Sequence, residues 1–142
     1  MTKTGRAGMN VVWAATALET GWFSGSERHS NVQDLEAHIK ALGTGLGQGY
    51  LEIRRPDGDL PYLALGFKGD HAVLHLFDNS GGVSLRVGDD SAAPSAEVEV
   101  VIMDELHAFT ADVALSMDHA WGIVHDFIQT GTPGELSDWY EL

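Results

Sequence analysis

Histidines are the residues in this sequence whose chemistry could most readily support a metal site, since there are seven of them. His71 and His75 would share one face of an extended strand, but four residues of strand separate them by about 13 Å, too far for one ion. His119 and His125 are six positions apart on an expected helix, so they point to different sides. No HExxH or EF-hand pattern occurs. We therefore predict surface or strand-edge histidines, no metal site and no other cofactor.

Covalent catalysis would need an activated nucleophile, and the sequence offers little support for one. It contains no cysteine and no GxSxG motif. Ser80, Ser84 and Ser116 have simpler roles in a turn, a strand and a helix cap. Adjacent acids such as Asp89 and Asp90 are typical of solvated loops and not of a general acid–base pair. A Ser-His-Asp set could assemble in space, but no sequence motif points to one. We therefore expect a protein that is not an enzyme.

The glycine-rich segment GTGLGQG, from Gly43 to Gly49, superficially resembles a phosphate-binding loop. It follows an expected helix instead of preceding one, and no Walker lysine follows it, so its geometry is opposite to that of a phosphate cradle. We predict a mobile loop between the first helix and the sheet. A pocket beneath this loop is the basis of an alternative function, that of a small-ligand-binding or enzymatic α+β domain.

The charge balance is the strongest compositional signal. Eight Lys plus Arg and 21 Asp plus Glu give a formal net charge of −13. Such a field repels nucleic acid and anionic membranes but attracts a basic protein, whose association it would accelerate. The alternative, that acidity only keeps the protein soluble, stays open. The absence of cysteine and of an apolar run behind Lys3 and Arg6 predicts a cytoplasmic protein without a signal peptide.

One domain is expected over residues 1–142, with residues 1–8 as a flexible tail. Helical periodicity and caps predict helices over residues 31–42, capped by Ser30 or Asn31, and 117–130, capped by Ser116. Alternation and turns predict strands at residues 9–14, 50–55, 60–67, 71–77, 83–87 and 97–103, with less regular candidates at 109–115 and around Trp139. Residues 21–30 are expected to be a polar connection.

Alternation also assigns the expected strands two faces. One face is apolar and would pack against the helices; it comprises Leu51, Ile53, Leu63, Leu65, Phe67, Leu74, Leu76, Val83, Leu85, Val98, Val100 and Ile102. The other face would be open to water; it comprises Tyr50, Glu52, Arg54, Tyr62, His75, Ser84, Arg86, Glu97 and Glu99. The predicted fold class is therefore α+β, an antiparallel meander sheet of about five to seven strands with two helices packed on one face.

Two long segments resemble a known family. The run GYLEIRRPDGDLPYLALGFKGDHAVLHLFDNSGGVSL is similar to the central hairpins of immunity protein family one of bacterial polymorphic toxin systems, and DHAWGIVHDFIQTGTPGELSDWYEL is similar to the family's last segment. The resemblance covers residues 11–142. It implies a cytoplasmic antitoxin that binds and neutralises the C-terminal domain of a cognate secreted toxin. Toxins paired with this family are commonly directed at nucleic acid, deaminases among them.

The acidity of the chain is compatible with that implication, because a toxin that acts on nucleic acid offers a basic surface which an acidic inhibitor could cover. The candidate partner-binding residues are turn acids, open-face residues and one loop tryptophan, namely Trp22, Tyr50, Glu52, Asp57, Asp59, Tyr62, Asp70, His75, Asp78, Arg86, Asp89 and Asp90. Each has an alternative explanation, since acids also terminate turns and open-face residues also form cross-strand pairs. A third hypothesis is a self-associating module, and the expected state is a monomer or weak dimer.

Overall fold

The computed structural model describes residues 9–142, so the flexible tail predicted for residues 1–8 lies outside the described residues. The elements of the described part are β1 (Asn10–Thr16), β2 (Phe23–Asn31), α1 (Val32–Gly45), β3 (Gln48–Arg54), β4 (Tyr62–Lys68), β5 (His71–Phe77), β6 (Val83–Arg86), β7 (Glu97–Ile102), β8 (Glu105–Thr110), η2 (Ala111–Val113), β9 (Leu115–Ser116), α2 (Met117–Thr130), η3 (Leu136–Asp138) and β10 (Trp139–Glu141). The class is α+β, as predicted.

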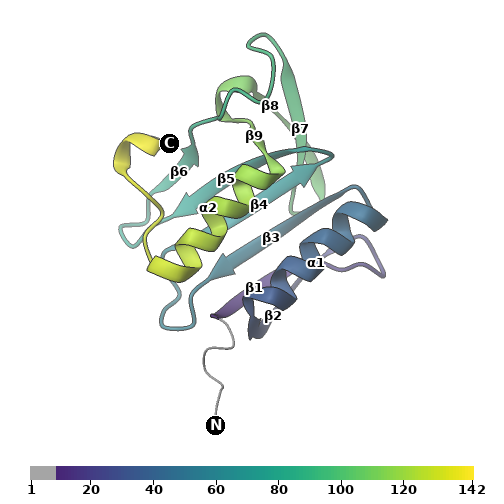
Figure 1. Cartoon of the computed structure of the whole chain (residues 1–142), viewed down its shortest axis with the longest axis vertical. Helices are drawn as coiled ribbons and strands as arrows, with labels where there is room; N and C mark the ends of the chain where they lie inside the picture. The colour runs from purple at the N-terminus through teal and green to yellow at the C-terminus, as the bar shows by residue number, and fades with distance from the viewer. Residues whose placement is uncertain (1–8) are drawn as a thin grey trace.

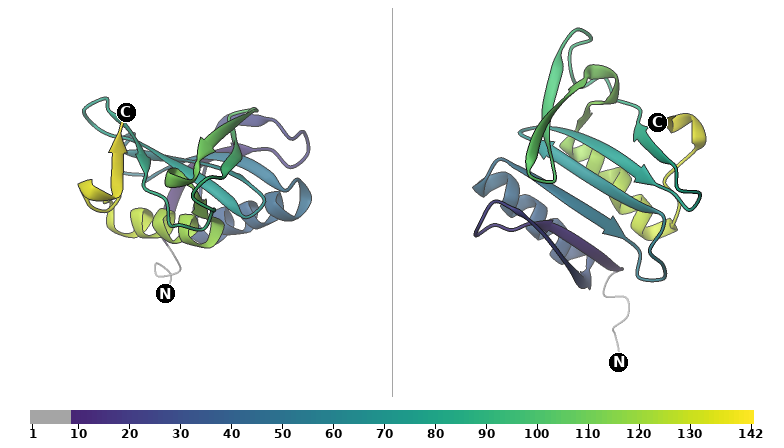
Figure 2. Two further views of the ribbon diagram at one scale, coloured as in Figure 1. Left: turned by 90° about the horizontal axis from the view of Figure 1, so that it is seen from above. Right: turned by 180° about the vertical axis from the view of Figure 1, so that it is seen from behind.

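The main sheet is antiparallel and has eight strands among the described residues. Its strand order is β10-β6-β5-β4-β3-β1-β2, and β9 pairs with the start of β5. Both helices lie on one face of this sheet, with α1 over β1 and β3 and α2 over β4 and β5 (Figure 1). The view from above shows the helices as one layer below the sheet and the second hairpin, β7–β8, on the opposite side (Figure 2).

The helices are fixed by caps that the sequence signals well. The Asn31 side chain accepts a hydrogen bond from the backbone N–H of Asp34, and the Ser116 hydroxyl accepts one from His119 N–H, so each helix has a capped N-terminus. Gly131 ends α2 with a left-handed backbone, φ 80°, a conformation that favours glycine. These two helix starts confirm the predicted cap residues.

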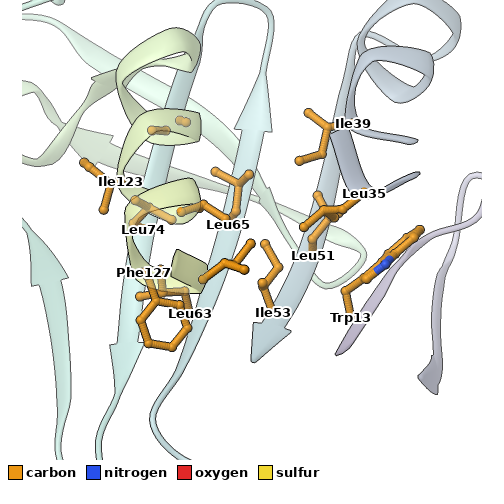
Figure 3. Packing of buried hydrophobic residues seen from close by; sticks show 14 of the residues in the cluster. Trp13, Leu35, Ile39, Leu51, Ile53, Leu63, Leu65, Leu74, Ile123 and Phe127 are labelled. Atoms are coloured by element: carbon orange, nitrogen blue, oxygen red, sulfur yellow. The ribbon is translucent and has the colours of Figure 1, made fainter. Parts of the chain in front are cut away.

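The main core lies between the helices and the sheet. Leucines and isoleucines on alternate positions of β3, β4 and β5 meet the apolar stripes of α1 and α2 (Figure 3). Phe127 of α2 is 1% exposed, and Leu35 of α1 is fully buried. Burial of such side chains contributes about 1.5–3 kcal/mol each, so this layer provides most of the hydrophobic stabilisation.

The second face of the sheet is half covered by the β7–β8 hairpin. Val101 packs there with Tyr50 and Ala64, and Val100 packs with Val73. The hairpin lies so close that a Cβ on Gly66 of β4 would overlap the Val101 carbonyl oxygen. The half of the face over β1, β2 and the far ends of β3 and β4 stays uncovered (Figure 2, right).

Several sequence-based boundaries need correction. Residues 21–30, expected to be a polar connection, largely form β2, a nine-residue edge strand. Helix α1 continues through Gly43 to Gly45, and β3 begins at Gln48, so the predicted loop from Gly43 to Gly49 is reduced to two residues. The strand predicted at residues 97–103 exists as β7 but pairs only with β8 instead of joining the meander. Residues 109–115 form the end of β8, η2 and the start of β9 instead of one strand.

The predicted faces are correct for β3, β4 and β5 but wrong for β6 and β7. Leu85 pairs with His75, so it lies on the second face, whereas Ser84 pairs with Leu76 on the helix face. Val100 packs on the second face as part of the hairpin. The bounds of both strands were predicted nearly correctly, but the register of β6 against β5 and the departure of β7 from the main sheet were not, and a register shift of one residue exchanges the two faces.

Candidate functional site

The uncovered half of the second face forms an open hollow of about 470 Å³. It is lined by Ala14, Gly25, Glu27, Glu52, Ile53, Arg54, Asp59 and Tyr62, which come from β1, β2, β3, β4 and the β3–β4 turn. We call this site the Arg54 hollow. Alternation places Glu52 and Arg54 on the same face of β3, and antiparallel pairing places Tyr62 opposite Arg54.

Arg54 organises the floor of the hollow. Its Nε and Nη2 donate to the two carboxylate oxygens of Glu27 on β2 at 2.9 and 3.0 Å, a bidentate pair. Its Nη1 donates to the Gly58 carbonyl at 3.1 Å and lies 3.7 Å from Asp59. The hydrogen bond from Arg54 lowers the pKa of Glu27. Arg54 therefore connects the edge strand β2 to the β3–β4 turn.

Three carboxylates, from Glu27, Glu52 and Asp59, line the hollow with the single guanidinium of Arg54. The Tyr50 hydroxyl donates to Glu52 at 2.8 Å, which holds that carboxylate in place. Tyr62 stacks on Phe77 at a ring-centroid distance of 4.4 Å and is half-buried. The hollow is thus a net acidic surface with one aromatic wall, suited to a cationic side chain.

Tyr50 corrects one prediction, because its side chain is buried and not open to a partner. Residue Tyr50 is 4% exposed beneath the β7–β8 hairpin and packs edge-on against Phe23 at 5.2 Å. Burial, followed by the hydrogen bond to Glu52, raises the pKa of its hydroxyl well above the usual value. Tyr50 therefore positions Glu52 without being exposed itself.

His75 and Arg86 also differ from prediction. His75 is half-buried under Phe109 of the hairpin, with ring centroids 6.0 Å apart, and burial followed by His107 lowers its pKa. Arg86 lies on the helix side, opposite Trp139, with its guanidinium carbon 5.7 Å from that ring. Neither residue belongs to the open face.

The predicted turn acids fall into two groups at opposite ends of the central strands. Asp57 and Asp59 are exposed in the β3–β4 turn, and Asp78 begins the β5–β6 turn at the same end of the sheet. Asp78 accepts hydrogen bonds from the hydroxyl and backbone of Ser80 and from Gly82 N–H, which lower its pKa. At the other end, Asp70 and Asp90 are exposed, so only Asp59 of these acids lines the Arg54 hollow.

Asp89 is part of a Ser-His-Asp cluster that the fold assembles. Its Oδ2 accepts from the Ser116 backbone at 2.9 Å and the Ser116 hydroxyl at 3.1 Å, and His119 Nδ1 lies 3.0 Å from the same oxygen. Burial would raise the pKa of Asp89, but hydrogen bonds from Ser91, Ser116 and His119 outweigh it and hold that pKa far below normal.

This cluster lacks the order of a catalytic triad. In a triad the histidine lies between the acid and the serine, and takes the hydroxyl proton. Here Ser116 donates that proton directly to Asp89, and its oxygen also caps α2 by accepting from His119 N–H. Asp89 therefore anchors the start of α2 to the β6–β7 connection, and it is not a free loop acid.

The segment from Gly43 to Gly49 borders two hollows. Leu46, Gly47 and Gln48 form one side of an open surface hollow of about 990 Å³, which the β4–β5 turn, the β6–β7 connection and the start of β7 complete. Leu46, Gln48 and Gly49 line a second hollow of about 110 Å³, shared with Thr16, Gly21 and Val101, which is smaller than the roughly 300–1,000 Å³ of ligand pockets. A Cβ on Gly49 would lie 2.9 Å from Leu42 Cδ1 and 3.1 Å from Phe67 Cε1, so side chains already fill the space beneath.

Trp22 is the most exposed of the aromatic candidates. It lies in the β1–β2 turn, 63% exposed, and its carbonyl accepts from Ala17 N–H at 2.9 Å. Thus the predicted residues that share the Arg54 hollow are Glu52, Asp59 and Tyr62, while Trp22 occupies the opposite end of the β1–β2 hairpin.

Sequence reasoning did not place Glu27 and Arg54 in the candidate site. Arg54 carried a usable signal, because it alternates with Glu52 on the same strand. Glu27 carried none, because its segment, FSGSERHSN, shows no apolar alternation and was not expected to be a strand.

No protein-family model matches this sequence, and no curated protein matches it significantly. Within residues 9–142, no group of three or more His, Cys, Asp or Glu side chains could hold a metal ion. In the same part of the chain, no helix combines the length and apolarity needed to cross a bilayer.

Proposed function

We propose that this protein is an immunity protein, an antitoxin that binds and neutralises the toxic domain of a cognate secreted protein in the cytoplasm. The target is a basic domain directed at nucleic acid, such as a deaminase or nuclease. Binding covers the target's cationic surface, so that its substrate is excluded both sterically and electrostatically. The protein acts through this contact and carries out no reaction of its own.

The observation that carries the proposal is the acidic Arg54 hollow on an uncovered sheet face. Carboxylates of Glu27, Glu52 and Asp59 line it with one guanidinium, and the exposed Asp57 lies in the adjoining turn. A lysine or arginine from a basic partner would meet a net negative surface there, with Tyr62 as an apolar wall. The net charge of −13 extends the attraction beyond the contact area.

The geometry of the titratable groups supports binding over catalysis. The Ser-His-Asp cluster has its serine hydroxyl committed to Asp89 and to a helix cap. In the Arg54 hollow, the carboxylate of Glu27 is paired with an arginine and that of Glu52 with a tyrosine hydroxyl, and the lining includes no serine, threonine or cysteine. Such an arrangement favours recognition of a cation.

The test is the association rate with the purified C-terminal domain of a candidate secreted toxin from the cells that make this chain. Asp59→Lys reverses a charge whose side chain is 93% exposed. We expect this change to slow association about threefold or more at low salt, with the difference shrinking as salt screens the field. Stopped-flow fluorescence measures the rate.

The matched control is Asp126→Lys, an equal charge change on the exposed side of α2, in the opposite layer. It should slow association less than Asp59→Lys, because it lies away from the proposed contact. Equal effects would show that only the net charge matters. If the wild-type chain neither binds the domain nor protects a bacterial host that expresses it, the proposed function is wrong.

A further inference from the structure

A cluster of exposed apolar side chains gathers at the end of the molecule opposite the β3–β4 turn. Trp22 is 63% exposed, Met103 48%, Leu46 40% and Leu18 37%. They come from the β1–β2 turn, the end of α1 and the tip of the β7–β8 hairpin. Single exposed apolar residues are normal on protein surfaces, but contiguous groups mark interaction sites. We call these four residues the Trp22 patch.

Close contacts bring these three segments together. The Phe23 backbone N–H donates to Asp104 Oδ1 at 2.7 Å, which ties the hairpin tip to the residue after Trp22. Leu18 Cδ2 lies 3.9 Å from the position that a Cβ on Gly45 would take, next to Leu46. The same end of the molecule appears in the view from behind, where the β1–β2 turn, the end of α1 and the hairpin tip converge (Figure 2, right).

The patch is held in shape and also contains a depression. The β1–β2 turn is closed by hydrogen bonds from Ala17 N–H to the Trp22 carbonyl and from Gly21 N–H to the Ala17 carbonyl. A hollow of about 110 Å³ opens between Gly21, Leu46 and Val101. That volume is below the roughly 300–1,000 Å³ of small-molecule pockets, so the depression suits part of one side chain. A preformed surface loses little conformational entropy on binding.

Exposed acids lie beside the patch, and Lys68, which lines a surface hollow together with Leu46, is paired with Glu99 at 3.5 Å. Glu19 precedes Trp22 in the turn, and Asp104 and Glu105 follow Met103 at the hairpin tip; all three are exposed. A second copy of this chain would bring these acids against themselves, and an anionic membrane would be repelled. A partner with apolar side chains inside a basic surface is complementary to both features.

We propose that the Trp22 patch is a protein-docking surface, and that its occupant is an apolar side-chain cluster, bordered by lysine or arginine, on the toxic domain. This inference rests on the proposed function and deepens it by naming a second contact, separate from the Arg54 hollow. Trp22 serves as the aromatic anchor, because tryptophans in such positions provide a disproportionate share of binding energy.

The experiment compares dissociation constants by calorimetry, with the same candidate toxic domain as the probe. Trp22→Ala and Met103→Ser should each leave the melting temperature nearly unchanged, since both side chains are largely exposed. We expect Trp22→Ala to weaken binding about tenfold or more, as hot-spot truncations do. The control is Leu136→Ala, whose residue is 95% exposed and lies in η3, away from the patch.

Hydrogen exchange provides a second readout that does not depend on a substitution. Amides of residues 17–23 and 102–105 should become protected in the complex, whereas those around Leu136 should not. Wild-type binding with unchanged affinity in Trp22→Ala and no protection at these residues would overturn the docking surface and leave the proposed function standing. Failure of the wild-type chain to bind would overturn both.

Sedimentation velocity over a concentration series tests whether a second copy of this chain covers the patch instead. Self-association that is lost in Trp22→Ala would show that a second copy covers the patch, which would overturn the proposal. A sedimentation coefficient that stays constant with concentration supports a partner of different charge.

Discussion

Replacing Asp89 by asparagine should destabilise the fold far more than the same change at the next residue. Asp89 accepts from the backbone and hydroxyl of Ser116 through Oδ2, with His119 Nδ1 at 3.0 Å, and from Ser91 N–H through Oδ1. An asparagine keeps one oxygen and replaces the other by an NH₂ group, which faces a donor instead of accepting from it. The carboxylate charge is lost as well.

The expected cost follows from the contacts. Hydrogen bonds to a charged group contribute about 1.5–3 kcal/mol each, but bonds that share one carboxylate are not additive. The Asp89 side chain is 13% exposed, so water replaces the lost partners only in part. We expect Asp89→Asn to lower the free energy of unfolding by about 2 kcal/mol. For a chain of this length that corresponds to a fall in melting temperature of about 6–8 °C.

Urea unfolding followed by circular dichroism measures this difference, with Asp90→Asn as the matched control. Asp90 is exposed and has a left-handed backbone, φ 63°, which asparagine also tolerates, so its change should stay within about 0.5 kcal/mol. Because the pKa of Asp89 is lowered in the folded state, its contribution is complete above the ordinary value of 3.8 and is lost as the pH falls below it. The difference in free energy of unfolding between wild type and Asp89→Asn should therefore become smaller as the pH falls below 3.8.

Two results would refute this reasoning. One is equal destabilisation by Asp89→Asn and Asp90→Asn at neutral pH. The other is a gap between wild type and Asp89→Asn that does not change on acidification, which would show that the charged carboxylate contributes nothing specific.

Two further predictions concern the β7–β8 hairpin. Gly66→Ala should destabilise the protein by about 2 kcal/mol or more, because its Cβ would overlap the backbone carbonyl of Val101; urea unfolding measures the loss, and hydrogen exchange should rise throughout the hairpin. Unaltered exchange there would contradict the close contact. Burial, with a contribution from His107, lowers the pKa of His75, so the unfolded chain takes up a proton first and stability is lost as the pH falls below 6.5. His75→Gln should lose less stability than wild type between pH 7.5 and 5.5 in the same assay, and parallel curves would contradict the assignment.

The helices and central strands could be predicted because their local signals agree with their tertiary environment. Asn31 and Ser116 are capping residues followed by apolar stripes of helical spacing. Strands β3, β4 and β5 have clear alternation and short turns. Edge strand β2 was missed because five consecutive residues among its nine are exposed. Both faces of the strand are therefore polar there, and the sequence shows no apolar alternation.

The position of the β7–β8 hairpin required three-dimensional information. Alternation in β7 shows that one of its sides is buried, but not which surface buries it. The hairpin leaves the meander and covers Tyr50 and His75, which alternation alone had assigned to an open face. The adjacent part of that face stays open, so Glu52 and Tyr62 were correctly expected to be accessible together.

The role of Asp89 could not be predicted from the sequence either. From sequence it is one of two adjacent acids in a loop, and the neighbouring residue is indeed solvated. Its decisive partners, Ser116 and His119, lie 27 and 30 positions further along the chain. Local sequence spacing cannot identify contacts over such a separation. Asp89, which holds the start of α2, therefore had the same sequence pattern as the solvated Asp90.

The lateral edges of the main sheet determine how the protein behaves when crowded. Strand edges with free backbone groups can recruit strands from other chains and begin aggregation. At one edge β2 is long but exposes Glu27, Arg28 and His29, and at the other edge β10 has only three residues. Charge at one border and shortness at the other make addition of a foreign strand unfavourable. Both edges therefore disfavour edge-to-edge pairing between copies of this chain.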